Sequence, residues 1–348
     1  MATKTIPIYQ RIGEGKENGR NKTSKMIRGN SNSTNRRNGN MSADQTARHI
    51  CIDAFQLDYV LPSHLEYYFQ SYAKQNRSRA VNSFVQAMEK QNLVRRFTLP
   101  AMRGKRGGSS SKVVALAQVG AQLVAEELAI PFSKVRFKPL SRETNLWFLS
   151  HTLEIADYVF CLRYATQESG HTVNWIGEAE LKRANPITIT LSIETQKGQE
   201  TTVQERPYRL IPDGVYSIQA PDKDGEEGRL THALFELDRG TTTLSSQSPL
   251  QKQGLKHKIV AYEEFMRLGL YKTLFSMKAP PRITWVTTSE KRLEGIRNTV
   301  EEVVDEKFLN LFWFTTQELA TPDAVLSKPI WSVAGRDELN VLFKGADE

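Results

Sequence analysis

The chain has 348 residues, a length that predicts two domains rather than one. With 39% hydrophobic and 25% charged residues, its composition is ordinary for a soluble globular protein. No apolar run approaches the roughly 18–20 residues that span a bilayer, and the N-terminus lacks the apolar core of a signal peptide. We therefore expect a cytoplasmic protein rather than a membrane or secreted one. Cys51 and Cys161 lie in apolar helical patterns, which predicts two small buried side chains in a reducing compartment.

Positive charge is concentrated in the first third of the chain. Residues 1–112 contain 20 lysines and arginines against 7 acidic residues, a net charge of +13. Because the whole chain carries +8, the remainder carries −5. Such an asymmetry is typical of a protein that binds a polyanion. The alternative is a basic tail that serves only solubility.

The first 42 residues are rich in Asn, Ser, Gly, Lys and Arg. Their apolar residues are too sparse to offset the entropy lost on ordering, so we expect a disordered basic tail. Such a tail can still contact phosphates without sequence preference.

Residues 43–130 predict a small domain of three helices and a hairpin. Ser42 can cap the first helix, Pro62 starts the second, and the third follows Asn76. Asn92 can end the third helix in a left-handed conformation. Two strands follow, and a glycine-rich basic loop joins them. The third helix has the spacing of a buried stripe at Val81, Phe84, Val85 and Met88.

This order of elements is the plan of a winged helix-turn-helix, a DNA-binding domain whose third helix enters the major groove. The alternative is a three-helix interaction module with a solvated basic loop. The polar side chains that fall largely off the buried stripe, and that we expect to reach base edges, are Arg77, Arg79, Asn82, Ser83 and Gln86. The loop side chains that we expect to neutralise phosphates are Arg103, Lys105, Arg106 and Lys112.

Residues 131–348 predict a second domain with a mixed sheet flanked by helices, which makes the whole chain α+β. A long helix is expected over residues 144–164. Later helices are expected over residues 249–268 and 291–304. The expected strands cover residues 172–180, 187–193, 208–219, 231–237, 283–287 and 308–314.

Three carboxylates and a lysine form the best candidate for chemistry. Glu236 and Asp238 are two apart on one expected strand, so their side chains share a face of the sheet, and Asp213 ends or kinks a neighbouring strand. Carboxylates gathered in this way can bind Mg²⁺ or Mn²⁺, which can activate water against a phosphodiester. Lys258 lies on the apolar stripe of the following helix and should point toward these acids. The alternative is a structural ion-pair cluster without a metal.

Several short motifs resemble the replication-relaxation family of plasmid and mobile-element proteins. Their order and spacing cover about residues 43 to 270. They are Leu116-Ala-Gln-Val-Gly120, Ser150-His-Thr-Leu153, Trp175-Ile-Gly-Glu-Ala-Glu-Leu181, Ile211-Pro-Asp-Gly214, Phe235-Glu-Leu-Asp-Arg-Gly-Thr241 and Lys258-x-x-x-Tyr262. The resemblance implies a role in plasmid replication and DNA relaxation.

The second domain is also similar to the PD-(D/E)XK nuclease fold, whose signature is an aspartate followed by Glu-x-Lys. Asp213 and Glu236 match this pattern, but Asp238 stands where the lysine belongs. In some members of that superfamily the lysine comes from the next helix, a part that Lys258 can take. Glu178 is a weaker candidate for a fourth acid.

Three functions are compatible with these observations. The first is a protein that binds double-stranded DNA in plasmid or mobile-element replication, with replication proteins as further partners. The second is a metal-dependent nuclease or nickase in which Asp213, Glu236 and Asp238 bind the metal and Lys258 stabilises the scissile phosphate. The third is a transcriptional repressor that uses the winged helix alone. The sequence leaves open the DNA target and whether the chain forms a homodimer.

Overall fold

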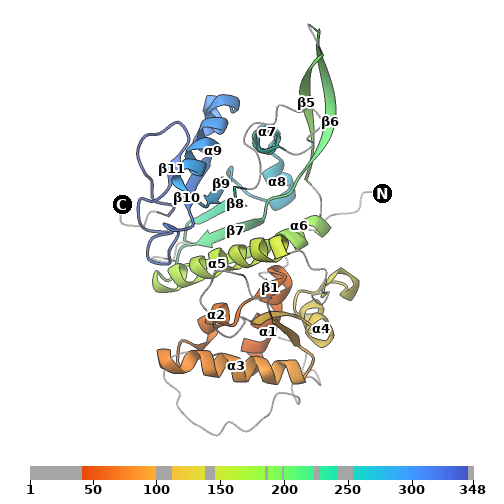
Figure 1. Cartoon of the computed structure of the whole chain (residues 1–348), viewed down its shortest axis with the longest axis vertical. Coiled ribbons are helices and arrows are strands. Elements are labelled where there is room, and N and C mark those ends of the chain that lie inside the picture. The colour runs from red at the N-terminus through yellow and green to blue at the C-terminus, as the bar shows by residue number, and fades with distance from the viewer. Residues whose placement is uncertain are drawn as a thin grey trace. The chain divides into compact units, whose positions relative to one another are not determined.

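A computed structural model describes residues 41–98, 112–137, 146–184, 187–197, 200–222, 228–240 and 254–343. The fold is α+β, as the sequence predicts. Contacts divide the chain into two units between Ala156 and Asp157, and we call residues 41–156 the first unit and residues 157–343 the second unit (Figure 1). None of the helices in these ranges is long and apolar enough to cross a membrane. The expected domain limits at residues 42 and 130 stay predictions.

The first unit contains the predicted helices and hairpin strands. Its sheet has the antiparallel order β1–β3–β2. Ser42 and Gln45 form a capping box at the start of the first helix, which explains why that helix begins where the sequence predicts. The elements in order are α1 (Ala43–Gln56), β1 (Tyr59–Val60), α2 (Pro62–Leu65), the 3₁₀ turn η3 (Glu66–Phe69), α3 (Lys74–Lys90), β2 (Val94–Thr98), β3 (Lys112–Leu116), α4 (Gln118–Glu127) and the 3₁₀ turn η4 (Phe132–Lys134).

Two tight backbone positions fix α3 and α4 to the hairpin. Asn92 has φ 56° and ends α3 in the predicted left-handed conformation. Gly120 lies in α4 so close to Leu93 that a Cβ there would be 2.0 Å from the Leu93 carbonyl oxygen. Only glycine fits this approach, which gives a structural reason for the glycine in the motif around it.

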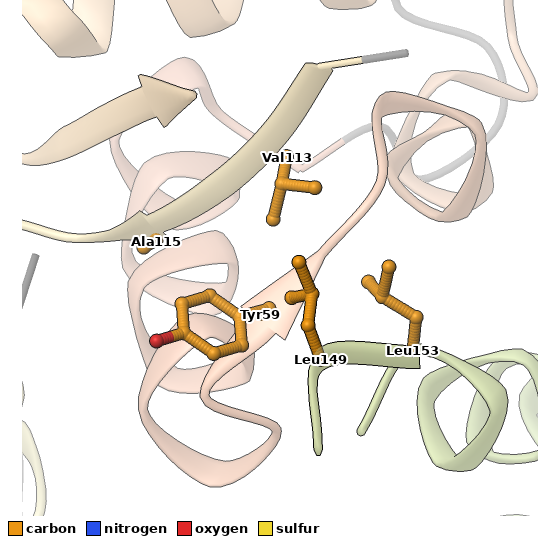
Figure 2. Packing of buried hydrophobic residues seen from close by; sticks show 5 residues of the cluster. All are labelled: Tyr59, Val113, Ala115, Leu149 and Leu153. Atoms are coloured by element: carbon orange, nitrogen blue, oxygen red, sulfur yellow. The ribbon is translucent and has the colours of Figure 1, made fainter. Parts of the chain in front are cut away.

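A small apolar cluster closes the first unit. Figure 2 shows side chains from β1, β3 and the first turns of α5 (Leu146–Glu168) that face one another. Leu61 and Phe97 pack against this cluster from its edge. The opening turns of α5 therefore contribute to the core of the first unit. The members of the cluster are Tyr59, Val113, Ala115, Leu149 and Leu153.

The second unit is built on a six-stranded sheet in the order β11–β10–β9–β8–β7–β4. Strands β8, β9 and β10 run parallel, and the other neighbours pair antiparallel, so the sheet is mixed, as predicted. The strands are β4 (Thr172–Gly177), β7 (Gly214–Gln219), β8 (Leu230–Asp238), β9 (Arg282–Thr287), β10 (Phe312–Thr316) and β11 (Ser332–Val333).

Helices cover both faces of this sheet (Figure 1). Tyr158 of α5 stacks on Phe235 of β8 on one face, with ring centroids 4.3 Å apart. On the other face Tyr262 of α7 contacts Trp285 of β9. Successive residues of a strand point to opposite faces, so the residue after Phe235 faces α7. The helices of the second unit after α5 are α6 (Glu178–Ala184), α7 (Leu255–Arg267), α8 (Leu270–Phe275), α9 (Glu290–Val303) and α10 (Glu306–Leu309).

Four expected strands have different limits in the structure, and the one expected over residues 187–193 continues to Lys197. The strand expected over residues 172–180 ends at Gly177, and a helix follows in which Glu178 and Lys182 pair one turn apart. The strand expected over residues 208–219 is two strands, because Pro212 has no N–H for a ladder and breaks the run. The first part of the strand expected over residues 308–314 is instead the end of α10.

The expected strand over residues 208–219 begins, in the structure, as the end of β6 (Glu200–Leu210), which belongs to a separate antiparallel ribbon. In this ribbon β5 (Ile187–Lys197) and β6 pair along their whole lengths. Ile187, Ile189 and Leu191 are buried at its base, where the ribbon packs against α7.

Candidate functional site

Polar side chains line one exposed face of α3. Val81, Val85 and Met88 bury the opposite face of this helix in the first unit. A helix surface repeats every three to four residues, so positions 79, 82, 83 and 86 lie together on one side. The exposed residues at these positions are Arg79, Asn82, Ser83 and Gln86, four of the five that the sequence selects on this helix.

The fifth of those residues, Arg77, has a different place. Its guanidinium donates hydrogen bonds to the carbonyl oxygens of Tyr72, at 3.1 Å, and Gln70, at 3.2 Å. Both carbonyls lie in the turn that leads from η3 into α3. Arg77 therefore closes the turn before the helix, a part that sequence spacing did not indicate.

The other end of α3 is tied to the hairpin. Glu89 accepts hydrogen bonds from the backbone N–H of Arg96 at 3.1 Å and from its side-chain Nε at 2.7 Å. Burial alone would raise the pKa of Glu89, but the hydrogen bonds and charge of Arg96 outweigh it and lower that pKa. The helix is thus held both at its start and at its end.

The loop of the expected wing falls on residues that the structure does not describe. Arg103, Lys105 and Arg106 all lie outside the described ranges. Lys112 is described and exposed, and it pairs with Thr98 where the two hairpin strands reach the loop.

In the second unit a carboxylate and a lysine meet beneath α7. The Glu236 side chain is 3% exposed, and Lys258 Nζ donates to its Oε2 at 2.5 Å. The Tyr262 hydroxyl donates to the other oxygen of the same carboxylate. Asp213 accepts the backbone N–H of Leu237 at 2.8 Å, and its charge acts on both Glu236 and Lys258.

The electrostatics of this pair favour a charged lysine. Burial alone would lower the pKa of Lys258, but the carboxylates of Glu236 and Asp213 outweigh it and raise that pKa. For Glu236, burial raises the pKa, and Lys258 is the strongest group that opposes the rise. Burial still prevails at Glu236, whose pKa is raised to about 8, and the charge of Lys258 limits that rise.

Asp238 faces the same side of the sheet but belongs to another network. Arg292 of α9 binds it with two hydrogen bonds, Nε to Oδ2 at 2.7 Å and Nη2 to Oδ1 at 2.8 Å. Thr287 and the N–H of Gly240 also donate to its Oδ2. This geometry fixes the end of β8 to α9.

The predicted metal ligands are therefore only partly brought together. Asp213 and Glu236 lie within electrostatic reach of one another, whereas Asp238 is engaged by Arg292. In the part of the chain that the structure describes, no three His, Cys, Asp or Glu side chains form a group that could hold a metal ion. Both oxygens of Glu236 and of Asp238 accept hydrogen bonds from the protein, so a bound metal ion would have to share these carboxylates with Lys258, Tyr262 and Arg292. The contacts themselves are those of the ion-pair alternative, and a metal site stays a prediction.

The sequence did not assign three of the side chains that take part in these two networks, and one residue that it did select lies outside them. Nothing in the sequence pairs Arg292 with Asp238, because 54 residues separate them. Tyr262 was named in the Lys258-x-x-x-Tyr262 motif but was given no part in the site. Tyr208 was not selected. Burial is the largest influence on the pKa of Tyr208 and raises it, and the charges of Lys258 and Glu236 act on it as well. The proposed fourth acid, Glu178, is paired with Lys182 in α6 instead.

A comparison with protein families agrees with the motifs. The family model described as replication-relaxation matches residues 63–275, a stretch that begins in α2, ends in α8 and includes α3 and the Glu236–Lys258 pair. Comparisons with curated proteins and with solved structures found no match. Because the family model covers more than half of the chain, the chain belongs to the replication-relaxation family, which indicates a role in replication or in the processing of mobile-element DNA.

Proposed function

We propose that this chain binds double-stranded DNA during plasmid or mobile-element replication, with its first unit acting as a winged helix-turn-helix. The observation that carries the proposal is the exposed face of α3, where Arg79, Asn82, Ser83 and Gln86 stand together opposite a buried stripe. The surrounding sequence has the charge that a polyanion requires, +13 over residues 1–112.

The chemistry of this face suits base edges. Asparagine and glutamine amides can bind adenine with two hydrogen bonds, and arginine can bind guanine in the same way. Neighbouring basic groups would neutralise phosphates and set the register of the protein on the duplex. Arg77 and the Glu89–Arg96 pair support the proposal because they hold α3 at both ends, and a helix that reads bases must be held rigidly.

Within this proposal the second unit has a structural part. Two buried ion pairs, Glu236–Lys258 and Asp238–Arg292, join helices α7 and α9 to the sheet. Such pairs specify one arrangement of helices on a sheet, and they need no bound metal to do so.

A nuclease is the second candidate, and one observation favours it. Asp213, Glu236 and Lys258 lie together, and these are the three residue types that the PD-(D/E)XK pattern requires. Incubating the chain with supercoiled plasmid and Mg²⁺ or Mn²⁺ tests this candidate. Nicking by the wild type that is lost in Asp213→Ala would favour the nuclease, and no nicking with either metal would favour the binding role.

Duplex binding is tested by fluorescence anisotropy on a labelled mixed-sequence duplex over a range of salt concentrations. The slope of log K against log salt is negative, and it should become less steep by about 0.9 for each phosphate that a variant no longer neutralises. Arg79→Ala should weaken binding to the duplex, whereas the control Lys328→Ala, at an exposed position of the second unit, should not. A wild-type chain that binds no duplex at low salt would refute the proposal.

A further inference from the structure

The segment that follows α4 holds an aromatic ring in solvent. Phe132 is 41% exposed, and its ring lies beside that of Phe137, with centroids 5.6 Å apart and planes inclined at 37°. Large aromatic side chains usually bury most of their surface in a fold of this size. Phe137 is half-buried, so the exposed Phe132 ring and the edge of its neighbour together present an accessible aromatic surface.

The backbone of this segment is fixed. Ala129 has φ 49° and ends α4, and the N–H of Ile130 reaches back to the carbonyl of Ala125 at 3.0 Å. The turn is then closed by hydrogen bonds from Lys134 N–H to Pro131 O at 2.8 Å and from Val135 N–H to Phe132 O at 2.9 Å. The buried side chain of Val135 anchors the turn to the first unit.

Two positively charged side chains lie between these rings in the sequence. Lys134 and Arg136 are both exposed and lie between Phe132 and Phe137 in the sequence. The carboxylate of Glu127, at the end of α4, is paired with Arg48. The exposed chemistry of residues 132–137 is therefore aromatic and cationic.

We propose that residues 132–137 bind single-stranded DNA, with bases stacked on the Phe132 and Phe137 rings and phosphates held by Lys134 and Arg136. Flat rings combined with cations suit an unpaired strand, because every base presents a π face and the backbone is anionic. In a duplex the base faces are already stacked on one another and cannot reach a ring. This inference rests on the proposed function and extends it: α3 would bind the duplex, and the 132–137 segment would bind a strand that has been separated from it.

The test measures binding of the full chain to a labelled mixed-sequence single strand and, separately, to a labelled duplex. Phe132→Ala should weaken single-strand binding about tenfold, because loss of one base–aromatic stack has an effect of that order. Duplex affinity should stay within about twofold, which is the expectation for a ring that stacks only on unpaired bases. Phe132→Trp keeps a stacking surface and should restore single-strand binding. The control Leu268→Ala removes an exposed apolar side chain, 57% exposed, from the second unit and should change neither affinity.

The basic residues have their own readout. Lys134→Ala with Arg136→Ala should reduce the salt slope of single-strand binding by about 0.7 for each phosphate that is no longer neutralised. Binding to an RNA strand of the same sequence should be equal or weaker, and a clear preference for RNA would overturn the assignment to DNA.

The outcomes separate the inference from the proposed function. Absence of single-strand binding at low salt, or an unchanged affinity in Phe132→Ala, would overturn the inference and leave duplex binding by α3 intact. Equal losses on the single strand and the duplex, without rescue by Phe132→Trp, would show a structural part for the ring and overturn the inference. Binding to the single strand alone would support the inference and refute the proposed duplex function.

Discussion

The exposed face of α3 and the buried face of β8 are both rich in polar side chains, yet the fold treats them in opposite ways. On α3 the side chains of Arg79, Ser83 and Gln86 are open to solvent. On β8 the carboxylates of Glu236 and Asp238 are 3% and 8% exposed as whole residues, and each is bound by a cation from a covering helix. The exposed side chains of Arg79, Ser83 and Gln86 on α3 are available to a partner molecule, whereas the carboxylates on β8 are engaged within the fold.

This difference separates stability from recognition. An exposed polar side chain adds little to the free energy of unfolding, so it can be selected for what it binds. A buried charge carries a large desolvation cost and must be compensated by its neighbours, so its removal acts first on stability. The predictions below test that separation, from the largest expected change in stability to the smallest.

Arg292→Met should have the largest effect, because it leaves the Asp238 carboxylate buried without its cation. We expect a loss of about 4 kcal/mol in the free energy of unfolding, measured by urea denaturation. The adjacent exposed residue is the control, and Lys291→Met should change stability by less than about 0.5 kcal/mol. Adding Asp238→Asn to Arg292→Met should recover part of the loss. Equal losses for Arg292→Met and Lys291→Met would contradict a buried ion pair at this position.

Lys258→Met should destabilise the second unit by about 3 kcal/mol at neutral pH. The effect is smaller than for Arg292 because the Lys258 side chain is 25% exposed, against 13% for Arg292. Lys256 lies two residues earlier on α7 in an exposed pair with Glu302, and Lys256→Met should lose at most about 1 kcal/mol.

The same variant has a pH dependence of definite sign. In the wild type, burial already raises the folded-state pKa of Glu236 to about 8, and without Lys258, its main opposing cation, that pKa should rise further above the unfolded-state value. The variant should then be most stable below the unfolded-state pKa and should lose stability as the pH rises through the folded-state pKa. Urea denaturation at a series of pH values measures this trend, and a variant that gains stability as the pH rises would contradict the burial of an uncompensated carboxylate.

The periodicity of helices and strands predicted much of both regions, and contacts between segments far apart in the sequence account for what was missed. The exposed face of α3 follows from a helical period of 3.6 residues, and the shared face of Glu236 and Asp238 follows from a strand period of two. Partners from distant segments have no such signature, so neither Arg292 beside Asp238 nor the return of Arg77 onto the preceding turn could be predicted. The break at Pro212 had a local signal, since proline interrupts a ladder wherever its missing N–H would face a neighbouring strand, whereas Pro207 is tolerated in β6 of the two-stranded ribbon.

Glu89→Gln tests a case between the exposed face of α3 and the buried face of β8, because the ion pair of Glu89 with Arg96 is partly exposed. We expect a loss of about 1 kcal/mol or less, measured by thermal unfolding. The pKa of Glu89 is lowered in the folded chain, so its contribution is present above the unfolded-state pKa and disappears as the pH falls through the folded-state pKa. The difference between wild type and variant should therefore shrink in acid. A difference that grew in acid would show that Arg96 does not stabilise the ionised form.

Asn82→Ala combined with Gln86→Ala should have the smallest effect on stability, within about 0.5 kcal/mol, because both side chains are exposed. The effect should fall instead on sequence preference, since removing each pair of base contacts takes away about 1–3 kcal/mol of discrimination at one base pair. Sequencing the duplexes that wild type and variant enrich from a randomised pool measures this. Asn298→Ala, at an exposed position of α9, is the control and should leave the enriched sequences unchanged. If the double variant enriched the same sequences with equal strength, α3 could not be the element that reads bases, and its exposed face would differ from that of any solvated helix only by its charge. If the preference changed while stability did not, the two regions would be separable by experiment, as their burial implies.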